Sequence, residues 1–436
     1  MQLNEYLSLL PQSPTLEMNE KIRELKLKGF EIHHFGFGES PFPVPLNVQQ
    51  ALIDNVDKNA YYPTAGLPEL RQNIANYFQD RLELETDMDQ ILIGPGSKEL
   101  IFNSIMAIDG VLMLPKPSWV SYRQQAKLIS KEVVDLETRW EDDLLLTGEV
   151  LEENLIELGM NWGKQKLLLL NYPNNPTGAT YTESQIIKLA EVCEKYNIIV
   201  ISDEIYGMLT FDGVHIPFAK YYKNTITTTG LSKDRSMGGY RIGVIRIPKK
   251  MEKLFSLLKS IGSETYSCVS SPMQHAAIEA YSRNEDMIQY IRRVRRLHEM
   301  IMTLSYDKLS LFTKIKIIKP KGAFYMFPSF KPYVNSFRKM GIHGSKDLAM
   351  WLLEKYKVAT LSCKPFGVDD DQYQLRLAIT DYDGKILLEN FDQITVDNIE
   401  EFIPSVITGL NKIIEACNFL ENHMYKITNN IVASEV

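Results

Sequence analysis

The sequence predicts an α/β protein, with a large lobe built on a mostly parallel, helix-covered sheet and a smaller α+β lobe formed from both chain ends. Three observations predict this fold class. At 436 residues, the chain exceeds the length over which one hydrophobic core keeps growing. From about residue 90, short apolar runs alternate with amphipathic stretches. From residue 284, a long amphipathic stretch and shorter pieces replace that alternation.

The alternating region contains apolar runs of strand length, most of them followed by a stretch with helical periodicity. "QILIG" precedes "SKELIFNSIMAI", "GVLML" precedes "PSWVSYRQQAKLI", and "KLLLLNYP" precedes "TESQIIKLAEVCEKY". "NIIVISDEIYG" and "NTITTTGLSK" are further strand-like runs. Continuous apolar strands separated by helices indicate parallel pairing, with helices on both faces of the sheet. Functional residues are therefore expected beyond the carboxyl ends of these strands.

A long helix is predicted over residues 284–304, where apolar residues recur at helical spacing. It carries four arginines, Arg292, Arg293, Arg295 and Arg296. We interpret them as a solvated or interface face, because the chain as a whole is acidic and offers nucleic acid no general attraction.

The smaller lobe is predicted from the pieces beyond this helix. "IKIIKP", "AFYMFPSF" and "YQLRLAI" are strand-like, and "SKDLAMWLLEKY" is helical. The predicted large domain covers 46–290, and the small domain joins 1–45 with 291–436. The acidic stretch at 139–162 is interpreted as a surface excursion with no assigned role.

Composition indicates a soluble enzyme that acts on small molecules. Hydrophobic residues make up 44% and charged residues 24% of the chain, and the formal net charge is −7. These values favour neither nucleic acid nor a membrane as partner. The four cysteines are far apart and read as thiols, and adjacent His33 and His34 would point to opposite faces, so no metal site is predicted. With no secretory signal in view, a cytoplasmic location is expected.

The stretch "GLSKDRSMGGYRIG", from Gly230 to Gly243, carries the strongest functional signal. It resembles the lysine signature of class I/II aminotransferases at every position that the signature restricts. The resemblance continues through "FGFGESPFP", "YYPTAGLPELR", "GPGSKEL", "PKPSWVSY", "NYPNNPTG", "SDEIYG", "KGAFYMFP" and "LRLAIT", and so covers about residues 35–380. It implies a fold type I, pyridoxal phosphate-dependent enzyme that has a seven-stranded sheet. It also implies that the enzyme works as a homodimer.

The resemblance implies that Lys233 holds the cofactor aldehyde as a Schiff base and then moves the α proton of the substrate. A lysine that is buried or flanked by cations has a lowered pKa, which suits both roles. The resemblance also implies that the cofactor phosphate is held by Ser232, by the forked guanidinium of Arg241, and by the start of a helix. The residues at that helix start are Gly96, Ser97 and Lys98, where free N–H groups and the helix dipole favour an anion.

Four further residues resemble the groups that hold the cofactor ring. Asp203, at the end of "IIVISD", is similar to the carboxylate that pairs with the pyridine nitrogen and keeps it protonated. Tyr206 and Asn175 are similar to the two groups that bind its phenolic oxygen. Trp119 resembles the aromatic side chain that stacks on the ring. Lys233, Asp203 and Tyr206 are thus the expected catalytic residues.

For the substrate, the resemblance implies that Arg376 binds the α-carboxylate with two parallel hydrogen bonds. Gly38 is similar to the segment that closes over the substrate, and Asn175 also faces it. Tyr61 resembles the tyrosine that one subunit lends to the phosphate site of the other, although adjacent Tyr62 is an alternative that the spacing leaves open. Lys98 is a candidate to bind a side-chain carboxylate of the substrate.

The sequence also departs from the family pattern and leaves alternatives open. A Pro-Gly pair that often precedes "FG" in the small lobe is replaced here by Ser362 and Cys363 in "VATLSCKPFG". The expected reaction is transfer of an amino group from an L-amino acid to a 2-oxo acid. A carbon–sulfur β-lyase or a cyclopropane-carboxylate synthase would use the same residues. A non-catalytic, ligand-sensing module would append a DNA-binding domain, for which we expect no room.

Overall fold

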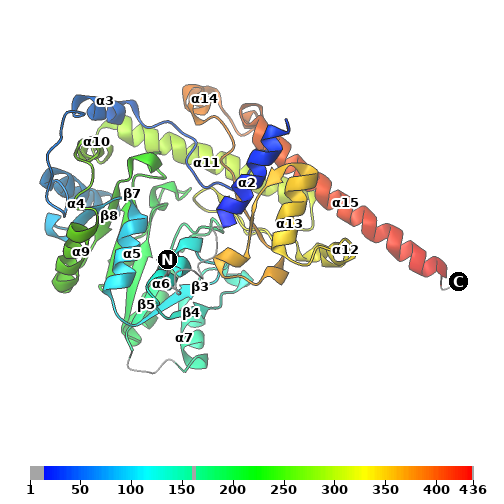
Figure 1. Cartoon of the computed structure of the whole chain (residues 1–436), viewed down its shortest axis with the longest axis horizontal. Helices are drawn as coiled ribbons and strands as arrows, with labels where there is room; N and C mark the ends of the chain where they lie inside the picture. Colours follow the sequence, from blue (N-terminus) through cyan, green and yellow to red (C-terminus); the bar gives the residue numbers. More distant parts are fainter. Residues whose placement is uncertain (1–13, 160–163, 435–436) are drawn as a thin grey trace, which may run out of the picture.

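A seven-stranded sheet forms the centre of the large lobe (Figure 1). The structure, a computed structural model, describes residues 14–159 and 164–434. Residues 1–13 and 435–436 of the predicted small domain lie outside it, as do residues 160–163, the first three of which end the acidic stretch. The strands of this sheet are β2 (Ile91–Gly94), β3 (Val111–Pro115), β4 (Val133–Leu136), β5 (Lys166–Asn171), β6 (Ile198–Asp203), β7 (Thr225–Gly230) and β8 (Gly243–Arg246). Their order is β2-β8-β7-β6-β5-β3-β4. Strand β8 is antiparallel to both neighbours and the other pairs are parallel, which confirms the predicted α/β class.

Helices follow most strands along the chain. Those of the large lobe are α3 (Leu46–Asp54), α4 (Pro68–Leu82), α5 (Ser97–Ala107), α6 (Val120–Leu128), α7 (Gly148–Glu157), α8 (Glu183–Lys195), α9 (Glu252–Thr265) and α10 (Ser271–Ala280). Helix α8 begins at a capping box, in which the Thr182 hydroxyl accepts a hydrogen bond from the Gln185 backbone N–H and the Gln185 side chain accepts one from the Thr182 N–H.

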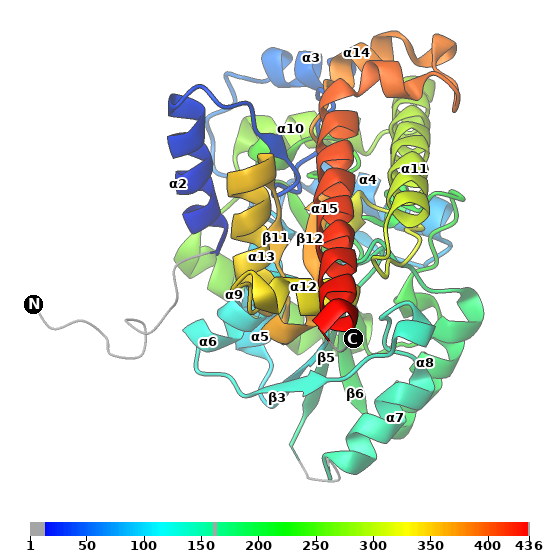
Figure 2. The same ribbon diagram turned by 90° about the vertical axis from the view of Figure 1, so that its right-hand side faces the viewer.

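Both faces of the sheet are covered, because its central strands are apolar along their length. Along β5, Leu167 and Leu169 join the cluster formed with α5 and α6, whereas Leu168 and Leu170 join the cluster formed with α8. Side chains alternate between the two faces of a strand, so one continuous leucine run builds two cores. Figure 2 shows α5, α6 and α9 on one side of the strands and α7 and α8 on the other.

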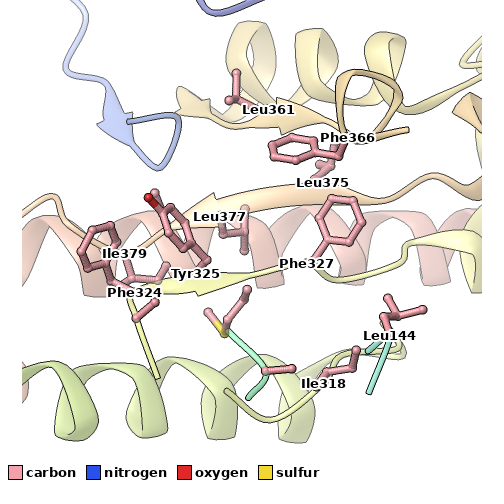
Figure 3. Close-up of a cluster of buried hydrophobic side chains, with 14 of the residues drawn as sticks. Leu144, Ile318, Phe324, Tyr325, Phe327, Leu361, Phe366, Leu375, Leu377 and Ile379 are labelled. Carbon is pink, nitrogen blue, oxygen red and sulfur yellow. The ribbon is translucent and has the colours of Figure 1, made fainter. Parts of the chain in front are cut away.

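The smaller lobe joins segments from both ends of the chain. Its strands are β1 (His33–His34), which pairs with β10 (Val358–Ala359), and an antiparallel group of β11 (Leu361–Ser362), β12 (Leu375–Ala378) and β9 (Tyr325–Met326). Its helices are α2 (Pro14–Leu27), α12 (Val334–Lys339), α13 (Ser345–Trp351), α14 (Gly384–Glu389) and α15 (Pro404–Ser434). Figure 3 shows Phe327, Leu375 and Leu377 within the apolar cluster around β9 and β12.

Helix α11 (Glu285–Phe312) runs between the two lobes (Figure 1). The Asn284 side chain caps its start by accepting a 2.9 Å hydrogen bond from the Met287 N–H. The helix predicted for 284–304 therefore exists and extends eight residues further, to Phe312. The domain boundary at 290/291 stays a prediction, and α11 runs across it.

Some predicted strands of the small lobe are wrong in extent. In "IKIIKP", Ile315 and Ile318 are the buried isoleucines, a spacing of three that no strand presents to one face, and the segment makes only a single bridge, from Lys316 to Ser329. "AFYMFPSF" is buried throughout, yet only two of its residues form a strand, because Pro328 has no N–H to donate to a ladder. Strands β4, β8 and β11 are not among the predicted elements.

No helix in the described part of the chain combines the length and the apolar character needed to cross a membrane.

Candidate functional site

A pocket of about 510 Å³ lies at the carboxyl edge of the sheet, next to the small lobe. Strands β2, β3, β5, β6 and β7 all point the same way, so the loops after them meet at this edge. The pocket has the size of a small-molecule site. The predicted residues that line it are Gly38, Ser97, Lys98, Trp119, Asn175, Asp203, Tyr206, Ser232, Lys233, Arg241 and Arg376.

Lys233 lies just beyond the end of β7 and reaches into this pocket. Its Nζ donates a 2.6 Å hydrogen bond to the carbonyl oxygen of Gly38, in the N-terminal segment. Burial, and next the positive charge of Arg376, lower the pKa of Lys233 to about 8, although Glu39 and Asp203 act in the opposite direction. Near pH 8 a large fraction of this amine is therefore neutral, which is the nucleophilic form.

This lowered pKa predicts how the reactivity of Lys233 depends on pH. In cofactor-free protein, we expect its acylation by an amine-reactive ester to rise with pH and reach half its maximum near pH 8. The rate should rise because only the deprotonated amine attacks. Ordinary lysine side chains in the same digest should gain reactivity up to above about pH 10. Peptide mass spectrometry measures both, and a Lys233 midpoint above about pH 10 would contradict the prediction.

Asp203 ends β6 as a buried carboxylate with two hydroxyl partners. The Tyr122 hydroxyl donates to its Oδ2 at 2.6 Å, and the Thr228 hydroxyl donates to its Oδ1 at 3.3 Å. Burial raises the pKa of Asp203 to about 6, while the Tyr122 hydrogen bond acts to lower it. The two hydroxyls therefore favour the ionised form of a group whose charged form burial disfavours.

Tyr122→Phe should lower the midpoint of thermal unfolding of the cofactor-free protein by about 2–5 °C at pH 8, and by less at pH 5. Loss of the donor raises the pKa of Asp203 further, so the destabilisation grows as pH rises through about 6 and the carboxylate ionises. Tyr181→Phe is the matched control, since the buried Tyr181 hydroxyl donates to the neutral Leu146 carbonyl and its loss should cost the same at both pH values. Equal pH dependence in the two variants would contradict the assignment.

The start of α5 and Arg241 form the basic end of the pocket. Arg241, in the left-handed region at φ 59°, donates to the carbonyls of Gly238 at 2.8 Å and Pro95 at 3.1 Å. Gly96 packs directly on it, because a Cβ there would lie 2.1 Å from the guanidinium. Lys98 Nζ lies 4.9 Å from the Trp119 ring centroid. Helix α5 directs free N–H groups at this end, so the arrangement suits an anion such as phosphate.

Hydrogen-bonding groups along the middle of the pocket are only partly satisfied. The Tyr206 hydroxyl shares a 2.8 Å hydrogen bond with the Tyr325 hydroxyl. Asn175 is positioned by its backbone N–H, which donates at 2.8 Å to the Asn171 side chain. The buried Oδ1 of Asn175 has no partner among the described residues. An unsatisfied buried amide that lines a pocket points to a ligand.

Arg376 lies on β12 at the small-lobe side of the pocket. One of its terminal nitrogens donates to the carbonyl of Gly36, and its buried Nε has no partner among the described residues. Its guanidinium lies 5.0 Å from the Tyr325 ring centroid, and the Tyr325 hydroxyl points toward the N-terminal segment, 3.4 Å from the Gly38 oxygen (Figure 3). This placement leaves donors of the fork available for a carboxylate.

Two predicted site residues do not line the pocket. Gly96 lies behind Arg241, and Tyr61 is 87% exposed. The hydroxyl of Tyr62, the alternative to Tyr61, shares a 2.7 Å hydrogen bond with His275 Nε2 of the same chain.

Sequence reasoning missed Tyr122 and Tyr325. Tyr122 stands three residues after Trp119, a helical spacing that could have placed both on one face at the start of α6. Tyr325 lies in a fully buried run, where no alternation marks the side chain that faces the pocket.

Comparisons with known proteins show which family this chain is similar to. The family model described as "Aminotransferase class I and II" matches residues 31–390. A probable aspartate/prephenate aminotransferase of Aquifex aeolicus is 34% identical over 83% of this chain and 90% of its own. An aspartate aminotransferase of Bacillus subtilis is 31% identical over 84% of this chain and 92% of its own length.

Solved structures give the same family. The aspartate aminotransferase of Thermotoga maritima superposes with a TM-score of 0.78 at 25% identity, over 95% of this chain and all of that one. The Thermus thermophilus aspartate aminotransferase with maleate shares the fold, with a TM-score of 0.81 at 24% identity. The match covers 95% of this chain and 99% of that one. The chain therefore belongs to the aminotransferase class I and II family and is an enzyme that transfers an amino group from an amino acid to a 2-oxo acid.

Proposed function

We propose that this transfer uses pyridoxal phosphate, and that Lys233 binds it covalently. The observation that carries the proposal is one pocket that is lined by an amine of lowered pKa, a buried carboxylate and a helix start that suits an anion. When bound, the cofactor supplies an aldehyde that condenses with amines and a pyridine ring that withdraws electrons.

The residues present fit that group. Ser97, Ser232 and Arg241 would hold the phosphate at the basic end, where a helix start and a guanidinium suit its charge. Asp203 would pair with a protonated ring nitrogen. Trp119 would cover one face of the ring.

The chemistry then depends on the neighbours of Lys233. Asn175, through its side-chain amide nitrogen, and Tyr206, through its hydroxyl, would donate to the phenolic oxygen. Arg376 would orient the substrate by its α-carboxylate. Lys233, once its amine is free, is placed to take the α proton, because its pKa of about 8 lies near neutral pH.

Borohydride reduction tests the covalent link. Protein saturated with pyridoxal phosphate and then reduced should carry one phosphopyridoxyl group per chain, on the peptide that contains Lys233. Lys98 lines the same pocket and provides an internal control. A label on Lys98, or none, would refute the proposal.

We further propose a dicarboxylic amino donor such as aspartate, with Lys98 binding its side-chain carboxylate. Lys98 lines the pocket together with Arg376, and relatives with 30–34% identity are named for aspartate. Lys98 stays exposed to solvent at the mouth of the pocket, while partial burial, and next the charge of Arg241, lower its pKa.

Lys98→Ala should therefore lower kcat/KM for aspartate by about tenfold to a hundredfold while changing that for alanine by less than about threefold, since only aspartate has a second carboxylate. Initial rates with 2-oxoglutarate as acceptor measure both. An equal loss for the two donors would contradict the assignment.

We also propose that the enzyme is a homodimer in which Tyr61 reaches the partner's phosphate site. Tyr61 is 87% exposed, whereas Tyr62 is engaged by His275 in its own chain. Tyr61→Phe should weaken binding of pyridoxal phosphate more than Tyr62→Phe does, as measured by equilibrium dialysis, and the reverse order would assign the role to Tyr62.

We propose a cytoplasmic location as well. The four free cysteines support a reducing compartment such as the cytoplasm.

A further inference from the structure

A second, much smaller cavity lies behind the two central residues of the active site. Asp203 and Lys233 line the main pocket, whereas the next residue in each case, Glu204 and Asp234, lines this rear cavity. Successive side chains of an extended segment point in opposite directions, so the end of β6 presents Asp203 to the front and Glu204 to the rear. Lys233 and Asp234 divide in the same way in the turn that follows β7. The rear cavity is therefore built from the same two strand ends as the active site.

Three of the residues that line the rear cavity have a buried polar atom without a partner among the described residues. These atoms are His215 Nδ1, Thr227 Oγ1 and Asp234 Oδ1. The His215 side chain is 2% exposed, Thr227 is fully buried, and Asp234 is 3% exposed. Buried polar atoms are rarely unsatisfied, and three around one cavity point to a bound group that bonds to all of them.

The partners of His215 decide which kind of group this is. His215 Nε2 lies 2.8 Å from Glu204 Oε2, and Glu204 also accepts hydrogen bonds from the Ser202 hydroxyl and the Phe218 N–H. A carboxylate that accepts this many donors is ionised, so Nε2 carries the proton that it donates to Glu204. The opposite nitrogen of a neutral imidazole, Nδ1, is then an acceptor.

Asp234 presents a second acceptor. Its Oδ2 receives a 2.6 Å hydrogen bond from Arg235, and its Oδ1 is left over. Thr227 supplies a hydroxyl that can donate. The cavity thus needs a group that donates twice, to His215 and Asp234, and accepts once, from Thr227.

We propose that one ordered water molecule binds in this cavity. The space open to the centre of a water molecule is about 10 Å³, roughly what a single water requires. Water has the two donors and the acceptor that the three atoms call for. A hard cation would need about six or more oxygen ligands, whereas the unpartnered set offers two oxygens and a nitrogen.

This water acts as a positioning element for the active site. It joins Asp234, which follows Lys233, to His215, whose other nitrogen holds Glu204, which follows Asp203. The two catalytic strand ends are then linked from behind by a single molecule. Small displacements of such groups are costly for catalysis, so loss of the link should be felt in turnover.

Thr227→Val gives opposite results for a hydrated and a dry cavity. If the water is present, the variant removes its donor and weakens its binding, and the unfolding midpoint should fall by about 2 °C. If the cavity is dry, the variant replaces an unsatisfied hydroxyl by a methyl group, and the midpoint should stay or rise. Thr360→Val is the matched control, since Thr360 is fully buried, its hydroxyl also lacks a partner among the described residues, and it does not line this cavity.

Turnover of the holoenzyme tests the positioning role. Thr227→Val should lower kcat by at least about threefold with KM unchanged, and Thr227→Ser, which keeps the hydroxyl, should restore it. An unchanged kcat, or a loss that serine does not restore, would overturn the positioning role.

A crystal structure of the holoenzyme decides occupancy even if the valine variant fails to fold. One density peak within about 3.2 Å of His215 Nδ1, Thr227 Oγ1 and Asp234 Oδ1 supports the proposal. An empty cavity overturns it. So does a rise in unfolding midpoint with K⁺ but not with tetramethylammonium, because it would assign the site to a cation.

Discussion

Lys233→Ala will lower kcat by about 10⁴-fold or more, the largest effect expected of any single substitution in this chain. The variant loses the amine whose pKa burial brings to about 8, and with it both the proposed covalent anchor and the proposed proton-transfer group. Steady-state transamination with aspartate and 2-oxoglutarate measures the loss.

The control for this substitution is Lys220→Ala. Lys220 pairs with Glu83 at 2.9 Å on the surface, away from the pocket, and its loss should leave kcat within about twofold. A Lys233→Ala enzyme that retains a tenth of the parent activity would show that another group moves the proton.

Asp203→Asn will lower kcat by about 10² to 10³-fold, the second largest effect. A neutral amide cannot compensate the positive charge that the proposed cofactor would carry on its protonated ring nitrogen in this buried site. The size of this loss matches that of removing one preorganised electrostatic partner in other enzymes. Lys233 remains in place, so borohydride should still attach the cofactor to it. Stopped-flow measurement of the half-reaction with aspartate isolates the chemical step.

Loss of covalent attachment together with kcat would contradict this assignment, since it would mean that the amide side chain has disturbed the fold of the pocket. Asp203→Glu keeps the charge but lengthens the side chain between Tyr122 and Thr228, and it should recover part of the rate.

The large lobe could be predicted from the sequence because its signal is local. A leucine run such as 167–170 has one structural reading when helical stretches flank it, and five of the seven strands follow from that pattern. Strand β4 was missed because it is only partly buried at the sheet edge, and β8 because it is only four residues long and begins at the last residue of the lysine signature, Gly243. In the small lobe, burial on all sides removes the alternation that would mark strands.

The candidate site was foreseen through motifs rather than through spacing. Lys233 and Arg376 are 143 residues apart, and nothing local in the sequence shows that they share a pocket. The resemblance supplied that juxtaposition, and the geometry places both there. The hydrogen bond from Tyr122 to Asp203 and the rear cavity could not be foreseen, since they depend on which side chains from distant segments meet at the ends of the strands.

The charges around the pocket oppose the charge of the whole protein. Four basic side chains, Lys98, Lys233, Arg241 and Arg376, face two carboxylates, Glu39 and Asp203, in a chain whose formal charge is −7. A concave positive spot on a negative surface attracts small anions and repels acidic macromolecules. The cofactor-free protein should therefore capture the anionic pyridoxal phosphate faster in dilute buffer, and this kinetic advantage should fade as mobile ions screen the field over about 10 Å at 0.1 M salt.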